Sequence, residues 1–227
     1  MLRTRDGRVR GTVPCAGCGL TPELCACPWL EEVELGFDLV VVRHAYERNR
    51  GSNTVRLLQR VVPATRVLPF GTEGRPFTAA TFGEMRRPVV LFPRGDRVLA
   101  PGDLVSADHD GHRRSLIVLD GSWSQCRRMA RRVPGITDLP FVRLPPTPER
   151  VWKLRRSESP SHVCTFEAVV RAVEVAGSPT AARVLRSSLA IVDVLGRHSR
   201  GFLDREEANR HLDAILEGRA DDRPQLR

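Results

Sequence analysis

The stretch "SLIVLDGSWSQCRRM" (115–129) joins a short apolar run to a segment with helical spacing. The run over 115–120 has the length and composition of a buried strand, and the residues after it begin a helix. Asp120, Ser122 and Trp123 therefore fall at a strand-to-helix turn. Taken alone, an aspartate at such a turn is more typical of a helix cap than of an active site.

Segments of strand type and of helix type alternate around this turn. "FDLVVVRH" (37–44) and "PVVLFP" (88–93) predict strands, and "SNTVRLLQRVV" (52–62) predicts a helix between them. Near the C-terminus, the spacing of apolar residues predicts a block of helices over 164–177, 178–198 and 204–218. Because strands that alternate with helices usually pair in parallel, we expect an α/β fold with a mainly parallel sheet flanked by helices.

The charge of the chain favours a polyanionic partner. Its 36 Lys+Arg outnumber its 27 Asp+Glu, which gives a net charge of +9, and such an excess suits binding to nucleic acid. A GC-rich genome would explain the preference for arginine over lysine, but it would not explain the net charge.

Nothing in the hydropathy of the chain indicates a membrane protein. No uninterrupted apolar run approaches the roughly 18 residues of a spanning helix. The basic start "MLRTRDGRVRGTV" (1–13) lacks the apolar stretch of a secretory signal. We therefore expect a cytoplasmic protein with no membrane partner, and no feature of the sequence indicates an obligate protein partner.

The segment "CAGCGLTPELCAC" (15–27) contains a Cys-x2-Cys pair and a Cys-x-Cys pair. Two close pairs can complete a tetrahedral metal site without an open position, which favours a structural zinc ion bound by Cys15, Cys18, Cys25 and Cys27. Two disulfides are the alternative, which a reducing cytoplasm disfavours. A redox Cys-x-x-Cys motif would leave the second pair unexplained. The two remaining cysteines, Cys126 and Cys164, are interpreted as ordinary core or helix residues.

Polar residues gather where predicted strands end and helices begin. "RHAYERNRGSNTVRLL" (43–58) follows an apolar strand directly, and "LFP" (91–93) ends another. "CTFEA" (164–168) opens a helix, with Thr165 and Glu167 near its positive end. Since α/β proteins tend to place ligands at such strand ends, these segments indicate a site without specifying a reaction.

Five features in register resemble the DTW-domain family over about residues 14 to 200. They are the cysteine run, the Asn-Thr pair at 53–54, the "LFP" strand end, the Asp-x-Ser-Trp turn at 120–123 and the Thr-x-Glu-Ala helix start at 165–168. Members of this family transfer the 3-amino-3-carboxypropyl group of S-adenosylmethionine to N3 of a uridine in tRNA, leaving methylthioadenosine. The chain departs from the family pattern at Ala45 and Val55, where proline and glycine are usual, and Ser122 replaces the usual threonine.

The resemblance also implies a fold and a division of the chain. The family is similar to the knotted SPOUT methyltransferases, which implies a SPOUT-like, knotted α/β core. The implied division is a flexible basic arm (1–13), a small zinc-binding module of four cysteines (14–30), a DTW catalytic domain ending in a helical block (31–217) and a flexible tail (218–227).

Roles for individual residues follow from the resemblance. Asp120 becomes the catalytic candidate, because a carboxylate near uridine N3 can accept or steer its proton. Backbone N–H groups at the turn and at the Thr165 helix start are expected to bind the carboxylate of S-adenosylmethionine. Trp123 either stacks on a base or belongs to the core, and Glu167 either bonds an amino group or complements the helix dipole. The full set implied for cofactor binding is Leu91, Phe92, Pro93, Leu119, Asp120, Ser122, Trp123, Thr165 and Glu167.

For RNA, the expected contacts are basic and polar residues, mostly beside the end of the first predicted strand. They are Arg43, Arg48, Arg50, Asn53, Thr54, Arg56 and Arg155. Three alternatives stay open: a zinc-ribbon RNA-binding protein without catalysis, an RNA methyltransferase of the SPOUT type, and rRNA in place of tRNA as the substrate.

Overall fold

All the strands of the sheet run parallel, as the alternation of segments predicts. The computed structural model describes residues 13–48, 50, 53–72, 77–105, 113–146, 151–154 and 163–216. Within these residues the sheet has six strands in the order β2-β1-β5-β3-β6-β4. Their bounds are β1 (Asp38–His44), β2 (Arg66–Phe70), β3 (Val89–Leu91), β4 (Arg97–Val98), β5 (Ser115–Asp120) and β6 (Phe141–Arg143).

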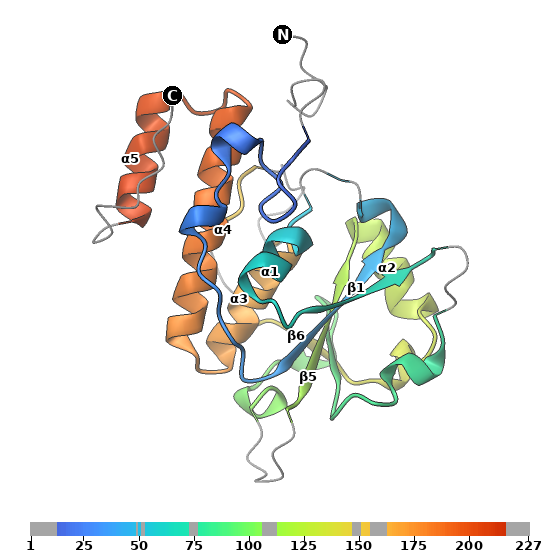
Figure 1. The fold of residues 1–227 in the computed structure, drawn as a ribbon. Helices are drawn as coiled ribbons and strands as arrows, with labels where there is room; N and C mark the ends of the chain where they lie inside the picture. The colour runs from blue at the N-terminus through green and yellow to red at the C-terminus, as the bar shows by residue number, and fades with distance from the viewer. Residues whose placement is uncertain are drawn as a thin grey trace.

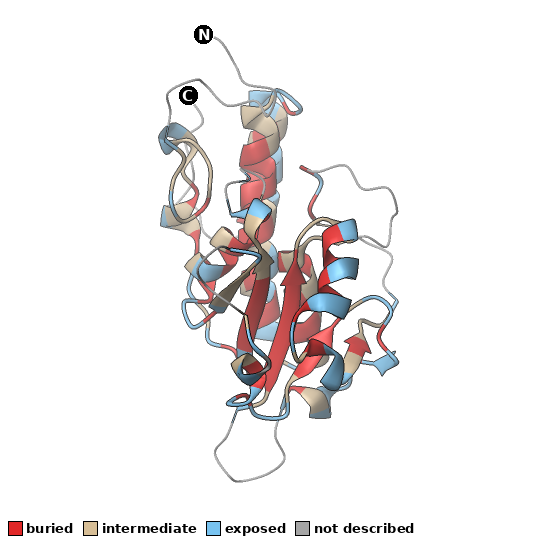
Figure 2. Ribbon diagram, turned by 90° about the vertical axis from the view of Figure 1, so that its right-hand side faces the viewer, coloured by how far each residue is buried: buried red, intermediate tan, exposed pale blue. Residues whose placement is uncertain are grey.

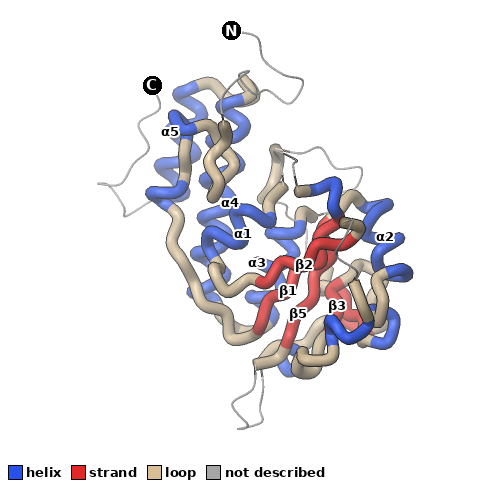
Figure 3. The backbone as a smooth tube through the Cα atoms, turned by 45° about the vertical axis from the view of Figure 1, so that its right-hand side comes forward, coloured by secondary structure: helices blue, strands red, loops and turns tan. Residues whose placement is uncertain are grey.

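Helices cover both faces of this sheet. They are α1 (Val55–Val61), α2 (Trp123–Arg132), α3 (Thr165–Val175), α4 (Pro179–Ser199) and α5 (Arg205–Ile215). Figures 1 and 3 show α1, α3 and α4 on one side of the sheet and α2 on the other. The α/β class is therefore confirmed, and the helices lie where the apolar spacing predicts them, with ends shifted by a few residues. The predicted knot stays a prediction.

The two faces of the sheet bury separate hydrophobic layers. Successive side chains along a strand point to opposite faces, so Val41 and Val118 join the layer of α1, α3 and α4, whereas Val40 and Ile117 join the layer of α2. All six residues of β5 are buried, and Figure 2 shows the central strands as the buried interior of the molecule. Strands that are covered on both faces have continuous apolar sequences, which is why the central strands stand out from the rest of the chain.

The N-terminal cysteine segment packs onto the helical layer. Ala26 and Leu30 are buried in the same hydrophobic cluster as residues of α1 and α4. The predicted tail (218–227), residues 1–12 of the predicted arm and Arg155 lie outside the described residues. The division into domains stays a prediction. Among the helices that the structure describes, none is long and apolar enough to cross a membrane.

Candidate functional site

Asp120 lies at the point where three elements meet. It is the last residue of β5, its side chain is buried, and both of its carboxylate oxygens accept hydrogen bonds. Asn53, which precedes α1, donates from Nδ2 to Oδ2 over 2.7 Å. Thr165, the first residue of α3, donates from its hydroxyl to Oδ1 over 2.8 Å. The carboxylate is thus held in one orientation by segments from distant parts of the chain.

The helix cap at this turn is Ser122, not Asp120. The Ser122 hydroxyl accepts from the Gln125 N–H at 3.3 Å, and the Gln125 side chain accepts from the Ser122 N–H at 2.6 Å. This reciprocal arrangement is a capping box, which satisfies two donors at the start of α2. Because Ser122 caps α2, the fixed orientation of the Asp120 carboxylate is not explained by helix capping.

The starts of α1 and α3 are bound to each other. The side chain of Asn53 accepts from the Val55 N–H at 3.0 Å, and the buried Thr54 hydroxyl accepts from the Phe166 N–H at 3.4 Å. The Glu167 N–H donates to Cys164 Sγ at 3.4 Å. The N–H groups of Phe166 and Glu167, at the helix start expected to bind a ligand carboxylate, therefore have hydrogen-bond partners inside the protein.

A half-buried arginine stands beside Asp120. Arg43 is the register partner of Asp120 across β1 and β5, so their side chains lie on the same face of the sheet. Burial lowers the pKa of the Arg43 guanidinium, whereas the Asp120 carboxylate raises it, and Arg48 and Arg56 act to lower it. Since an arginine keeps its charge under such shifts, the site contains a fixed cation next to its carboxylate.

A cavity of about 530 Å³ opens along the carboxyl ends of β1 and β2. Its lining combines two arginines with polar and apolar groups, namely Arg43, Ala45, Arg48, Gln59, Val67, Pro69 and Thr72. Two of the residues expected to contact RNA therefore line it, and none of those expected to bind S-adenosylmethionine does. The cavity thus lies beside Asp120, on the side where the arginines are.

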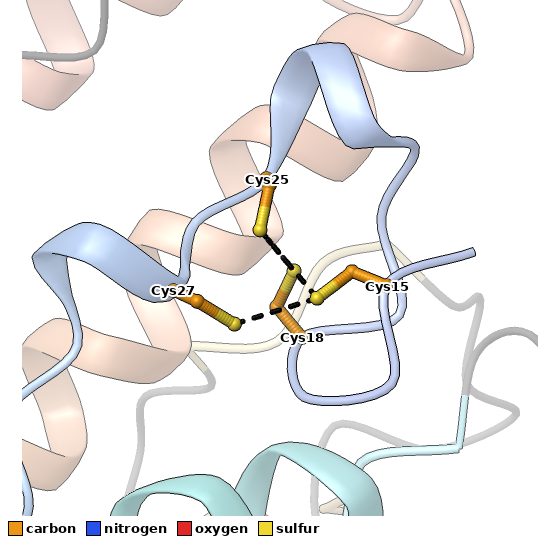
Figure 4. Close-up of side chains that lie close together, drawn as sticks. All are labelled: Cys15, Cys18, Cys25 and Cys27. Carbon is orange, nitrogen blue, oxygen red and sulfur yellow. Dashed lines mark hydrogen bonds between the residues drawn. The ribbon is translucent and has the colours of Figure 1, made fainter.

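The four N-terminal cysteines form a compact cluster. Their side chains point toward one another (Figure 4), and all four sulfurs lie within 4.8 Å of one another. The Sγ–Sγ distances are 3.5 Å for Cys15–Cys27, 3.5 Å for Cys15–Cys25 and 3.8 Å for Cys18–Cys25. A tetrahedron of sulfurs around zinc, with Zn–S bonds of about 2.3 Å, has edges of about 3.8 Å. The cysteines are free thiols, and their geometry suits a metal ion.

A comparison with known protein families identifies the family of the chain. Residues 13–193 match the family described as the DTW domain. The chain belongs to the DTW-domain family. No solved structure matches it. The match includes the cysteine cluster, Asp120 and the start of α3, and membership of this family is consistent with an enzyme that modifies tRNA.

The DTW domain separates the residues expected to bind S-adenosylmethionine between two faces. Asp120 and Thr165 meet on the face of α1 and α3. The side chain of Leu119 packs in the opposite layer, under α2, and Phe92 packs there too, in an edge-to-face contact with Phe141 at 6.0 Å. The remaining members of the set are Leu91, which is buried, Pro93, which is exposed, and Ser122 and Trp123, which are partly exposed at the start of α2.

Glu167 offers an unused acceptor inside the DTW domain. Its side chain is 2% exposed. Oε1 accepts from the Val151 N–H and from Arg171, each at 3.1 Å. Oε2 is buried and has no hydrogen-bond partner in the part of the chain that the structure describes. A buried acceptor without a donor is costly unless a ligand or water supplies one, so this atom suits an ammonium group.

Glu47 is a further buried carboxylate, which the sequence pattern did not reveal. It is 2% exposed, at the end of a short 3-10 helix (Ala45–Glu47) that follows β1. Its Oε1 lies 3.2 Å from Arg50 Nε, without the geometry of a hydrogen bond. Burial, and to a smaller extent the charges of Asp120 and Glu47, raises the pKa of the Cys126 thiol to about 12. Both carboxylates therefore lie near enough to Cys126 for their charges to act on its thiol.

Arginines of α1 attach the cysteine cluster to the rest of the DTW domain. Arg60 donates to the carbonyl oxygens of Cys27 and Leu30, each at 3.4 Å. Arg56 donates to the carbonyl oxygen of Cys15 at 3.5 Å. Arg56, expected from the sequence to contact RNA, therefore lies against the cysteine cluster instead of pointing freely to solvent.

The two other cysteines are structural, as interpreted from the sequence. Cys126 is buried, and its thiol donates to the Leu119 carbonyl oxygen at 3.5 Å. Cys164 is the N-cap residue of α3, and burial raises the pKa of its thiol to about 12. A thiol with so high a pKa is a poor nucleophile at neutral pH.

Proposed function

We propose that this DTW-domain protein transfers the aminocarboxypropyl group of S-adenosylmethionine to N3 of a uridine in tRNA. In this reaction a bond forms between N3 and the γ-carbon of the methionine chain as the bond from that carbon to sulfur breaks. Methylthioadenosine leaves with the electron pair, and the N3 proton is released. The observation that carries the proposal is Asp120, a buried carboxylate fixed by Asn53 and Thr165 within a family matched over most of the chain.

Asp120 is suited to receive the N3–H group of uridine. An ionised carboxylate has about four acceptor positions on its two oxygens, and hydrogen bonds from Asn53 and Thr165 take one on each oxygen. The uridine N3–H is proposed to donate to this carboxylate. Asp120 therefore orients and polarises the N3–H bond, and it takes the proton as N3 attacks.

Glu167 is suited to hold the amino end of the transferred group. When bound, S-adenosylmethionine supplies a γ-carbon made electrophilic by the adjacent sulfonium. The unused Oε2 of Glu167 accepts from its ammonium, which favours the amino role over a contribution to the helix dipole alone. We place the rest of the molecule between the ends of β3 and β5 and the start of α2, at Leu91, Phe92, Pro93, Leu119, Ser122 and Trp123.

The arginines beside the cavity are suited to the phosphates of tRNA. Arg48 and Arg50 are exposed and Arg43 is half-buried, and arginine is well adapted to bidentate phosphate contacts. Asn53 and Thr54 instead hold the starts of α1 and α3 around Asp120. The cysteine cluster is proposed to bind zinc in a structural role, since four thiolates leave no position for a substrate.

The test is a transfer assay with the full chain. Purified protein is incubated with an unmodified tRNA transcript and S-adenosylmethionine, and the RNA is then digested to nucleosides for mass spectrometry. A uridine heavier by the aminocarboxypropyl group, together with released methylthioadenosine, is expected. A methylated uridine would replace the proposed reaction by methyl transfer. Unmodified tRNA with modified rRNA fragments would change the substrate, and unmodified RNA of both kinds would favour a binding protein without catalysis.

A further inference from the structure

An aromatic pair stands exposed directly after β1. Tyr46 is the single tyrosine of the chain, and it is 77% exposed. Its ring stacks on that of His44, with centroids 5.4 Å apart and planes inclined by 25°. The Tyr46 N–H donates to His44 Nδ1 at 3.3 Å. The two rings are therefore held in a stacked arrangement by the local backbone, before any ligand arrives.

The surroundings of this pair are cationic. Arg48 and Arg50 lie exposed on the same turn, and Arg43 precedes the pair at the end of β1. Arg43 and Arg48 line the cavity, as does Ala45 between the two rings in sequence. An exposed aromatic ring among arginines combines the two contacts that single-stranded RNA makes with proteins, base stacking and phosphate pairing. Charge thus favours RNA over a protein partner at this surface.

The position of the pair relative to Asp120 indicates which base it serves. Arg43 lies on the same face of the sheet as its register partner Asp120. His44 is the next residue along the strand and points to the opposite face. A base on the two rings therefore lies toward the opposite face of the sheet from the carboxylate. That displacement suits a neighbour of the reacting nucleotide, not the reacting base itself.

We propose that Tyr46, supported by His44, is a stacking platform for an unpaired base that flanks the target nucleotide. The phosphate between the two nucleotides then lies in the cavity beside Arg43 and Arg48. The identity of the RNA as tRNA rests on the proposed function. The stacking itself requires only an unpaired RNA base, so the platform and the transfer reaction can fail independently.

The test compares variants of Tyr46 with a matched exposed aromatic residue elsewhere. Phe202 is 66% exposed and lies between α4 and α5, far along the chain from the site. Dissociation constants are measured at one salt concentration by fluorescence anisotropy, for labelled tRNA transcript and for a labelled single-stranded RNA oligonucleotide. We expect Tyr46→Ala to weaken binding of both RNAs about 10-fold. The dissociation constants of Tyr46→Phe and Phe202→Ala should stay within about twofold of that of the unmodified protein. Tyr46→Phe keeps an aromatic ring, and Phe202 is not part of the proposed platform.

The salt dependence separates stacking from electrostatics. Tyr46→Ala should leave the slope of log Kd against log salt unchanged, because no phosphate contact is lost. Three outcomes overturn the platform: Tyr46→Ala binds as tightly as the unmodified protein, Phe202→Ala weakens binding equally, or Tyr46→Phe binds as weakly as Tyr46→Ala. If the unmodified protein binds RNA through Tyr46 but transfers nothing, the platform stands and the proposed reaction falls. If it transfers normally and Tyr46→Ala binds normally, only the platform falls.

Discussion

The Asp120 carboxylate is held by hydrogen bonds from residues that are close in space but distant in the sequence. Its two donors are 67 and 45 residues away in the sequence. The motifs around Asn53, Asp120 and Thr165 are visible in the sequence and attract attention through their resemblance to a family. Their meeting at one carboxylate is not visible, because it depends on how the parallel strands and two helix starts are placed.

Replacing Asp120 by asparagine tests its role without disturbing the fold. Asparagine retains an oxygen for Asn53, and its amide can donate to the Thr165 hydroxyl, which is able to accept. The loss of the negative charge should lower the transfer rate by about 100-fold or more. Thermal unfolding monitored by circular dichroism should change little. Asp120→Ala serves as the contrast, since it leaves two donors without an acceptor and should cost about 1–3 kcal/mol of stability. Normal turnover by Asp120→Asn would remove Asp120 from the mechanism.

Replacing Glu167 by glutamine separates its charge from its structural bond. The glutamine oxygen can still accept from the Val151 N–H, so the protein should fold with a similar melting temperature. Binding of an ammonium group at the second position should weaken, because the amide nitrogen is a donor. We expect the KM for S-adenosylmethionine to rise about 10-fold or more, a loss consistent with a charged hydrogen bond. An unchanged KM would assign Glu167 to the structure alone.

At the scale of elements, a continuous apolar composition decided whether the sequence revealed a strand, since the three buried residues of β3 were found and the five mixed residues of β2 were not. β1 and β5 are long, buried and apolar, and their patterns are unmistakable. β4 has two residues and β6 has three, too few for any periodicity to appear. β2 contains Pro69 and lies at the edge of the sheet, where proline is tolerated because no neighbour needs its missing N–H. The carboxyl edge could thus be located from sequence, but the cavity beside β2 could not.

Gly17, in the turn within the cysteine cluster, leaves no room for a side chain. A Cβ atom at Gly17 would lie 2.8 Å from Cys27 Sγ, a distance that real contacts do not tolerate. Gly17→Ala should therefore displace one sulfur and reduce the zinc content from about one ion per chain to a small fraction. Gly36→Ala is the matched control, since nothing lies within 4 Å of a Cβ there. Metal analysis of the purified proteins measures both, and equal zinc contents would contradict the proposed cluster.

At the scale of the molecule, one path of contacts leads from the cysteines to the carboxylate. The cluster is bonded to Arg56 and Arg60 of α1, and Asn53, at the start of that helix, is bonded to Asp120. Residues such as Glu47 and Tyr46 complete the same edge. Their sequence context is a stretch of mixed polar residues, which says nothing of the burial of one and the exposure of the other.

Removal of the proposed zinc ion should therefore alter the site around Asp120. A chelator should lower the melting temperature, because the free energy of binding a structural zinc contributes to folding. At a temperature where the metal-free protein stays folded, we expect transfer to fall about 10-fold and to recover when zinc is added back. Full activity of a folded, zinc-free protein would show that the cluster and Asp120 are independent.

The net positive charge of the molecule should make its binding to RNA depend on salt concentration. With a net charge of +9 and the phosphate contacts proposed for Arg43, Arg48 and Arg50, binding of tRNA should weaken with salt, with a slope of log Kd against log salt of roughly two to three. Arg48→Gln should reduce that slope by about one. Anisotropy titrations at several salt concentrations measure both. A slope near zero would contradict a phosphate-binding edge.

If Asp120 acts as proposed, the arrival of its two donors also sets the moment in folding at which the protein becomes active. Contacts between residues far apart in the sequence form late, because closing a long loop costs entropy before the contact compensates for it. During synthesis, the carboxylate lacks its second donor until α3 has left the ribosome. In a refolding experiment, transfer activity should therefore recover at the rate at which α3 docks against β5, and not at the rate of the earlier pairing of β1 with β2.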